Sequence, residues 1–112
     1  MIDSIVVESN AQTPRERLLR GFQALADPTR LEILRLLEEG TRCVCQIQDS
    51  LPEVASNLLS HHLRVLREAG LVNAVRRGRW IDYSLNEEAL EQLRRAIPGP
   101  KAFFTACACE EA

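Results

Sequence analysis

The stretch that decides the fold of this chain is SNLLSHHLRVLREAGLV, residues 56–72. Leu59, Leu63 and Leu66 recur at positions i, i+4 and i+7, which places them in one stripe along a helix. We expect this helix to end at Gly70, because glycine commonly terminates helices. The pattern after Gly70 no longer fits a helix, so the chain is expected to continue as a strand.

Two strand-like segments follow this glycine. Residues 71–75 and residues 80–85 are rich in β-branched, aromatic and other apolar side chains, as strands are. The segment between them is Arg76-Arg77-Gly78-Arg79. Together these features predict a β-hairpin with a positively charged tip.

Helix-start signals mark further helices on both sides. Thr13 and Glu16 form a capping-box pattern around Pro14, and Asp27 with Pro28 repeats the combination of a cap residue and a proline. The expected helices run from Thr13 to about Leu25, from Asp27 to Gly40, from Cys43 to Ser50, from Val54 to Ala69 and from Asn86 to Ile97.

The order of these elements predicts the fold class. A short helix, a tight turn, a longer helix and a hairpin follow one another as in a winged helix-turn-helix domain. We therefore predict a mainly α fold with a β-hairpin wing over residues 13–97. Residues 1–12 are expected to form an N-terminal arm, and residues 98–112 a cysteine-containing tail that begins with Pro98-Gly99-Pro100.

The composition fits one small domain with an aliphatic core. The chain has 112 residues, of which 46% are hydrophobic but only 4% are aromatic. Its apolar runs are far shorter than the ~20 residues that a membrane span requires. The first residues carry two acids and no basic flank, unlike a secretory signal. We therefore expect a cytoplasmic protein without a membrane partner.

Basic side chains are concentrated in one segment, although the formal net charge of the chain is −2. Residues 61–81 contain five arginines against a single acid, Glu68. A local basic surface of this kind suits the phosphates of nucleic acid. The alternative is a charged face that is merely solvated.

The predicted helix over residues 54–69 carries polar side chains beside its leucine stripe. Such a helix can enter the major groove of double-stranded DNA while the hairpin tip reaches the flanking phosphates. The residues expected to contact DNA are Ser56, Asn57, Ser60, His61, Arg64 and Arg67 on the helix, and Arg76, Arg77 and Arg79 on the hairpin. His62 is expected to be a half-buried packing residue. Neither histidine is expected to bind metal, because both belong to the DNA-reading helix.

The cysteines form two Cys-x-Cys pairs, Cys43 with Cys45 and Cys107 with Cys109. In a reducing compartment this pattern points to ligands for a soft metal. The alternative is that the first pair is simply buried and the tail pair is incidental. Residues two apart on a regular helix point about 200° apart. Both sulfurs can therefore bind one ion only if the first turn of this helix is irregular or deforms on binding. A deformation would strain the helix that supports the DNA-reading helix. The helix N-terminus, and Arg42 if it lies nearby, would favour the thiolate.

Three segments together resemble the ArsR/SmtB family of transcriptional repressors: ALADPTRLEIL at residues 24–34, SHHLRVLREAGLV at residues 60–72 and GRWIDY at residues 78–83. The resemblance extends over about residues 16–93. It implies a homodimer, joined by the first and last helices, that binds operator DNA and leaves it when metal is bound. The chain departs from the family's Ser-Gln-Pro-Thr-type start of the reading helix at residues 55–58, so the operator sequence does not carry over.

The first cysteine pair resembles the Cys-Val-Cys element of arsenic- and cadmium-type members of this family. The third cysteine of the fullest arsenic-type motif is missing, so we expect Cys107 and Cys109 to complete the site, within the subunit or across the dimer. The family's Asp/His zinc site on the last helix is expected to be absent, because residues 86–97 contain no histidine. Because all four candidate ligands are cysteine sulfurs, As(III) or Sb(III) is favoured as the effector, followed by Cd(II), Pb(II) and Zn(II).

Three other functions compete with metal sensing. A redox- or persulfide-responsive repressor would use the same fold, and a DNA-binding protein without a ligand would not need its cysteines. A thiol enzyme is the remaining possibility. It is disfavoured because the sequence has no Cys-x-x-Cys, no phosphate-binding glycine loop and no strand–helix alternation. We therefore expect no enzymatic activity.

Overall fold

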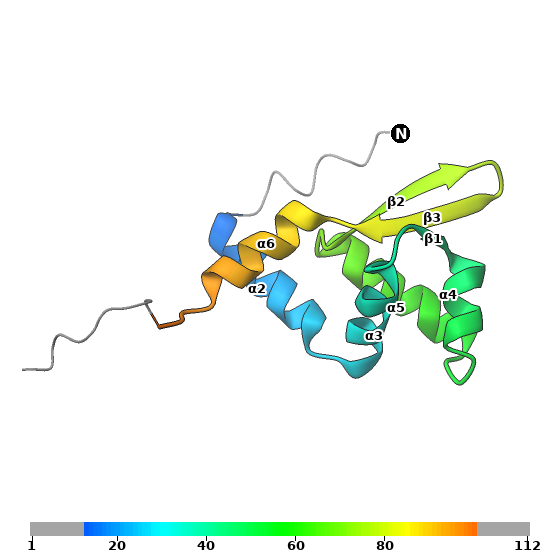
Figure 1. The fold of residues 1–112 in the computed structure, drawn as a ribbon, viewed down its shortest axis with the longest axis horizontal. Helices are drawn as coiled ribbons and strands as arrows, with labels where there is room; N and C mark the ends of the chain where they lie inside the picture. The colour runs from blue at the N-terminus through cyan, green and yellow to red at the C-terminus, as the bar shows by residue number, and fades with distance from the viewer. Residues whose placement is uncertain (1–12, 101–112) are drawn as a thin grey trace, which may run out of the picture.

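The computed structural model describes residues 13–100. Within them, five helices and three strands follow one another as α2 (Pro14–Leu25), α3 (Pro28–Leu37), β1 (Arg42–Cys43), α4 (Val44–Ser50), α5 (Ser56–Glu68), β2 (Val72–Arg77), β3 (Trp80–Leu85) and α6 (Glu87–Ala96). The hairpin of β2 and β3 projects from the helical body, and α2 lies beside α6 at the end away from α4 (Figure 1). This is the predicted winged helix-turn-helix fold. We call α5 the reading helix and the β2–β3 hairpin the wing.

The helix starts follow the predicted capping signals. The Thr13 hydroxyl accepts a hydrogen bond from the Glu16 N–H at 3.1 Å, and the Glu16 carboxylate accepts one from the Thr13 N–H at 3.0 Å. This reciprocal pair is the predicted capping box. The Asp27 carboxylate accepts a hydrogen bond from the Arg30 N–H at 3.0 Å and thereby caps α3. Two long helices are thus fixed at their first residues by the local sequence.

The core lies between the reading helix, the other helices and the sheet. Leu59, Leu63 and Leu66 are at most 1% exposed, which confirms the predicted leucine stripe. The other side chains buried to the same degree are Ile33, Ile47 and Leu71. Because these partners come from α3, α4 and the segment before β2, the stripe holds the reading helix against most of the domain.

Helices α2 and α6 approach each other closely at Gly21. A Cβ atom added at this position would lie 2.9 Å from Leu93 Cδ2 on α6, closer than such atoms normally come. The absence of a side chain at Gly21 therefore lets the two helices pack at short range.

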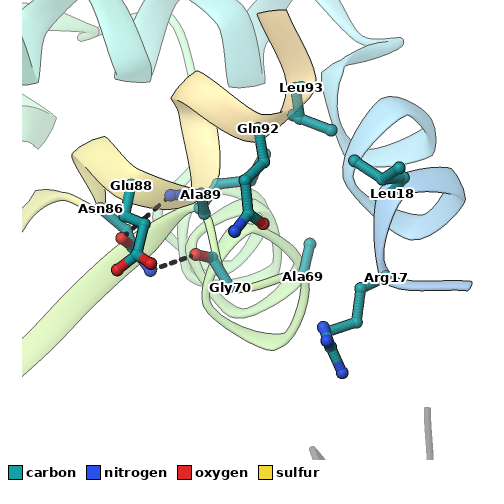
Figure 2. Close-up of a pocket in the computed structure, with 10 residues that line it drawn as sticks. Arg17, Leu18, Ala69, Gly70, Asn86, Glu88, Ala89, Gln92 and Leu93 are labelled. Atoms are coloured by element: carbon teal, nitrogen blue, oxygen red, sulfur yellow. Dashed lines mark hydrogen bonds between the residues drawn. The ribbon is translucent and has the colours of Figure 1, made fainter. Parts of the chain in front are cut away.

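Asn86 joins the end of the reading helix to the start of α6 (Figure 2). Its Nδ2 donates a hydrogen bond to the Gly70 carbonyl at 2.9 Å, and its Oδ1 accepts one from the Ala89 N–H at 3.2 Å. Gly70 has a φ of 80°, a left-handed conformation that glycine adopts readily at helix ends. Asn86 therefore caps the start of α6 and at the same time binds the backbone at the end of the reading helix.

Several predicted boundaries are wrong by a few residues. The reading helix starts at Ser56 and not at Val54, because the Val54 N–H is used in a turn with the Leu51 carbonyl. Strand β2 continues to Arg77, so the hairpin turn consists of Gly78 and Arg79 only. Gly78 has a φ of 61°, as a two-residue hairpin turn requires.

The short strand β1 is absent from the sequence prediction. It pairs antiparallel with β3, so the sheet has the order β1-β3-β2. Cys43 therefore lies in a strand, and the third helix begins after it at Val44. The predicted arm over residues 1–12 and residues 101–112 of the predicted tail lie outside the described residues.

Candidate DNA interface and thiol site

The reading helix presents the predicted DNA-contacting residues on its outer side. All six are exposed: Ser56, Asn57, Ser60, His61, Arg64 and Arg67. At ~100° per residue they fall within an arc of about 140°. Ala55, which precedes the helix, provides no side-chain hydrogen bond to its first turn. The helix therefore offers a continuous polar face to a groove, together with its own first N–H groups.

The three wing arginines differ in their surroundings. Arg79 lies in the turn and is exposed. Arg76 is also exposed, and its Nη1 donates a long hydrogen bond of 3.4 Å to the Gly78 carbonyl. Arg77 forms an ion pair with Asp82 on β3, whose side chain is only 14% exposed. Arg79 and Arg76 are therefore better available to phosphates than Arg77.

The Arg77–Asp82 pair also shapes the electrostatics of the wing. The hydrogen bond to Asp82, and then the negative charge of that carboxylate, raise the pKa of Arg77. The two residues lie on neighbouring strands, since Arg77 pairs with Trp80 and Asp82 with Val75 in the β2–β3 register. This ion pair therefore ties the base of the charged tip together across the two strands.

His62 lies on the inner side of the reading helix, where it meets α3. Its side chain is 14% exposed, whereas its neighbour His61 is exposed. Its Nδ1 lies 3.1 Å from Arg30 Nη1 and 3.9 Å from Asp27 Oδ2. The position matches the prediction of a half-buried packing residue, and it adds two polar partners that the sequence alone does not reveal.

Cys43 and Cys45, which we call the thiol pair, lie together at the start of α4. Their Sγ atoms are 2.8 Å apart and both cysteines are free thiols. Cys43 has extended backbone angles, φ −82° and ψ 166°, because it is the cap residue before the helix. Of the two alternatives that the sequence leaves open, an irregular first turn and a deformation on binding, the structure therefore shows the first. The two sulfurs meet without any deformation of α4.

Hydrogen bonds within the first turn of α4 set the acidity of the thiol pair. The hydrogen bond between the two thiols lowers the pKa of Cys43, which the Gln46 N–H lowers further. The same contact raises the pKa of Cys45. Gln46 also accepts a hydrogen bond from the Cys43 N–H at 2.9 Å through its side chain. The Gln46 N–H at the start of α4 therefore favours the thiolate form of Cys43.

Arg42 does not assist this thiolate, contrary to one expectation from the sequence. Its Nε donates to the Leu36 carbonyl at 3.1 Å, and its Nη2 pairs with Glu39 at 3.0 Å. Consecutive residues of a strand point to opposite faces of the sheet. Arg42 accordingly fastens the end of α3, while Cys43 projects from the other face.

The thiol pair is connected to the wing through the sheet. Cys43 is paired with Asp82 in the register of β1 and β3. The charge of Asp82 raises the pKa of Cys43, although less than the hydrogen bonds lower it. Since Asp82 also forms an ion pair with Arg77, one carboxylate links the thiol pair to an arginine of the wing.

The other two predicted ligands, Cys107 and Cys109, lie outside the described residues. Among residues 13–100, no group of three or more His, Cys, Asp or Glu side chains is arranged to hold a metal ion. The described part of the chain therefore supplies two sulfurs and needs further ligands to complete a metal site.

The comparisons with known proteins identify the family. The model of the "Bacterial regulatory protein, arsR family" matches residues 27–74. The arsenical resistance operon repressor of Bacillus subtilis is 41% identical over 73 residues, which cover 64% of this chain and 69% of that protein. The chain belongs to the ArsR family. The cadmium resistance regulatory protein CadC homolog of Staphylococcus aureus is 38% identical to this ArsR-family chain over 83 residues, or 73% of the chain and 67% of the relative.

Solved structures agree with the ArsR-family assignment. A homodimeric winged helix-turn-helix DNA-binding domain from Mycobacterium bovis superposes with a TM-score of 0.62 and 30% identity. The match covers 76% of this chain and 83% of that one. The relatives are named as transcriptional regulators and repressors, so this ArsR-family protein is a transcriptional repressor and not an enzyme. Among residues 13–100, no helix has the length and apolar character needed to cross a membrane.

Proposed function

We propose that this ArsR-family repressor is a metal(loid) sensor of the cytoplasm. In the proposal, a homodimer binds operator DNA, and a thiophilic ion that binds Cys43 and Cys45 releases it. Arsenite or antimonite is the favoured effector, followed by Cd(II), Pb(II) and Zn(II). The observation that carries the proposal is the 2.8 Å separation of the two Sγ atoms at an accessible helix start.

The spacing of the thiol pair suits a shared ion. Two sulfurs bound to one tetrahedral zinc ion at ~2.3 Å stand about 3.8 Å apart. The thiol pair therefore has to open by only about 1 Å to accept an ion of that size. Thiolates are also the ligands that soft ions prefer.

Further ligands are proposed to come from Cys107 and Cys109. Two sulfurs leave an arsenic(III) site one ligand short and a tetrahedral zinc site two ligands short. In Figure 1, α6 leads away from β1, so the chain enters its final segment at the end of the domain remote from the thiol pair. This direction favours a tail contributed by the partner subunit of the dimer.

The proposed dimer uses the first and last helices of the described domain. Leu19 on α2 is 56% exposed and Ile97 at the end of α6 is 59% exposed, although both are large apolar side chains. Large exposed apolar residues on adjacent helices are typical of a surface that is covered in an assembly. The relative from Mycobacterium bovis is named as a homodimer, which supports a dimer here but does not identify the helices that form it.

The proposed DNA contacts are the six residues on the outer face of the reading helix, together with Arg76, Arg77 and Arg79 on the wing. The link from Cys43 through Asp82 to Arg77 supports a route from the thiol pair to this surface. An ion that displaces Cys43 shifts the strand that faces Asp82. The ion pair at the base of the wing then has to adjust.

The test combines ion binding with DNA release. The reduced protein is titrated with arsenite, antimonite, Cd(II), Pb(II) and Zn(II), while sulfur-to-metal absorption and the anisotropy of labelled promoter DNA are followed. We expect absorption and release to saturate together, and both to be lost in the C43S/C45S variant. If that variant still releases DNA at the same ion concentration, the thiol pair is not the sensor.

A mixed dimer decides which subunit supplies the tail. One chain carries C43S/C45S and the other carries C107S/C109S. If the tail acts across the dimer, the mixed dimer contains one complete site and regains about half of the metal absorption. If the tail acts within its own subunit, the mixed dimer contains no complete site and regains none. The two homodimeric variants serve as matched controls.

The sulfur contact also favours a second candidate, a thiol-redox repressor. Hydrogen peroxide can oxidise the two thiols to a Cys43–Cys45 disulfide, with both hydrogens leaving in two molecules of water. This candidate predicts release of DNA by peroxide, a mass lower by two hydrogens, and full reversal by a dithiol reductant. Release by metal ions at equal or lower concentration, without a change in mass, favours the metal(loid) sensor instead.

A further inference from the structure

We propose that His62 is a positioning residue for DNA binding: as a neutral imidazole it locks the reading helix to α3 through the hydrogen bond that it accepts from Arg30. The inference rests on the DNA-binding part of the proposed function and is independent of the thiol pair.

The geometry of the Arg30–His62 contact fixes the state of the ring. Arg30 Nη1 lies 3.1 Å from His62 Nδ1, between residues that are 32 positions apart in the sequence. A guanidinium group has only N–H donors and stays charged at all ordinary pH values. Nδ1 therefore has to be the acceptor, which leaves the ring proton on Nε2 and the imidazole neutral.

Arg30 is itself held at two other points. Its Nε donates to the Ala24 carbonyl near the end of α2 at 2.6 Å. Its backbone N–H donates to the Asp27 carboxylate, the cap of α3, at 3.0 Å. One arginine thus joins the end of α2, the start of α3 and the middle of the reading helix. A guanidinium held in this way cannot follow His62 if the histidine moves.

The position of His62 on the reading helix gives this contact its function. The leucine stripe fixes the distance of the helix from the core but consists of apolar contacts without directional preference. The hydrogen bond to Arg30 is directional and lies beside the stripe, so it resists rotation of the helix about its axis. Rotation is the motion that would carry Ser60, His61 and Arg64 away from the groove.

The charged groups that face His62 are Asp27 and Arg30 on the α3 side and His61 on its own helix. Burial is the largest cause that lowers the pKa of His62. The charges of Arg30 and His61 act in the same direction, and Asp27 opposes them. Protonation would place an N–H on Nδ1 against the N–H of Arg30 and bring two cations together. Acidification is therefore expected to break the lock.

The sign of the pH effect follows from this direction. The pKa of His62 is lower in the folded protein than the ordinary value of 6.5. The stabilisation that the neutral His62 ring provides is thus complete above about pH 6.5, and it is lost as the pH falls through the lower, folded-state pKa. Operator affinity that depends on the lock should fall over the same range.

The experiment compares the unchanged protein with H61N, in which His62 is the only imidazole because the chain has two histidines. Since His61 is itself a proposed DNA contact, the variants at His62 are compared with H61N and not with the unchanged protein. Operator affinity is measured from about pH 5 to about pH 8 in the unchanged protein, H61N, H61N/H62N and H61N/H62L. The side-chain amide that H62N introduces keeps an acceptor close to the position of Nδ1 but does not titrate. A leucine removes the acceptor while keeping an apolar volume, and thermal unfolding controls for misfolding.

The three variants should differ in operator affinity and in its pH dependence. We expect H61N to lose affinity on acidification, H61N/H62N to stay within about threefold of it at neutral pH and to lose the pH dependence, and H61N/H62L to bind about tenfold more weakly throughout. Nitrogen NMR shifts of H61N should show the proton on Nε2. The inference is overturned if H61N/H62N keeps the acid loss or if the spectrum shows the proton on Nδ1. Failure of the unchanged protein to bind operator DNA would instead refute the proposed function, while the NMR result still decides the state of His62.

Discussion

Cys43 and Asp82 face each other across the pair of strands β1 and β3. Asp82 is at the same time the partner of Arg77 on the wing. A surface thiol and an arginine of the wing therefore share one carboxylate. In the proposed function, this relationship places the sensing thiols within two side chains of the wing that contacts DNA.

Neutralising Asp82 should make Cys43 more acidic. Asp82 raises the pKa of the Cys43 thiol through its charge, so Asp82→Asn is expected to lower that pKa. The pH dependence of alkylation by iodoacetamide measures the shift, with the alkylated residue located by mass spectrometry. Glu88→Gln on α6 is the matched control, because it removes an equal charge from an exposed helical position. An unchanged alkylation profile in Asp82→Asn would separate Asp82 from the thiol pair.

The wing arginines should contribute unequally to operator binding. Arg79→Ala is expected to weaken binding to all DNA sequences alike and to reduce the salt slope of log Kd by about one, as the loss of one phosphate contact does. Arg77→Ala should change the slope less, because Arg77 is already neutralised by Asp82. Binding isotherms at several salt concentrations give both slopes. Equal slopes for the two variants would contradict this assignment.

A larger residue at Gly21 should destabilise the domain. Gly21→Val brings a branched side chain against Leu93, where even a Cβ atom comes within 2.9 Å. Overpacking of this kind costs about 1–3 kcal/mol in the free energy of unfolding, which urea titration measures. Valine has a higher helix propensity than glycine, so propensity cannot explain a loss of stability in Gly21→Val. Gln23→Val, at an exposed position of the same helix, is the control for a branched side chain in α2. Equal losses in the two variants would mean that α2 and α6 can move apart freely.

Asp27 should contribute to stability in a defined pH window. The hydrogen bond from the Arg30 N–H is the largest cause that lowers its pKa below 3.8, so the unfolded chain takes up this proton first. The contribution is present above about pH 3.8 and is lost as the pH falls through the folded-state pKa. Asp27→Asn keeps the cap but not the charge, so the free energy of unfolding of this variant should depend less on pH in this range. Asp27→Ala should cost about 1 kcal/mol at neutral pH.

The sequence predicts best where the fold depends on local patterns. The capping box at Thr13 and Glu16, the leucine stripe and the hairpin all follow from residues close together in the chain, and the structure confirms them. The boundary errors arise where a turn or a strand continues beyond its recognisable composition. Arg76 and Arg77 are charged, as residues of exposed turns often are, but their backbone belongs to strand β2.

Nonlocal contacts account for what the sequence does not reveal. A strand of two residues has no periodicity, so neither β1 nor the pairing of Cys43 with Asp82 could be anticipated. The contact between Arg30 and His62 also depends on the packing of two separate helices. The predicted start of the third helix at Cys43 is wrong for a similar reason, because Cys43 pairs with a residue far away in the sequence and lies in a strand.

The location of the thiol pair at a helix cap has a consequence for how sensors of this kind can diversify. Cys43 caps α4 and Cys45 lies on its exposed side, so neither sulfur fills space in the core. Under the proposed function, substitutions at these two positions can alter the recognised ion while the folding unit and its operator preference are inherited unchanged. Inducer choice and promoter choice can then evolve as separate traits within one short chain.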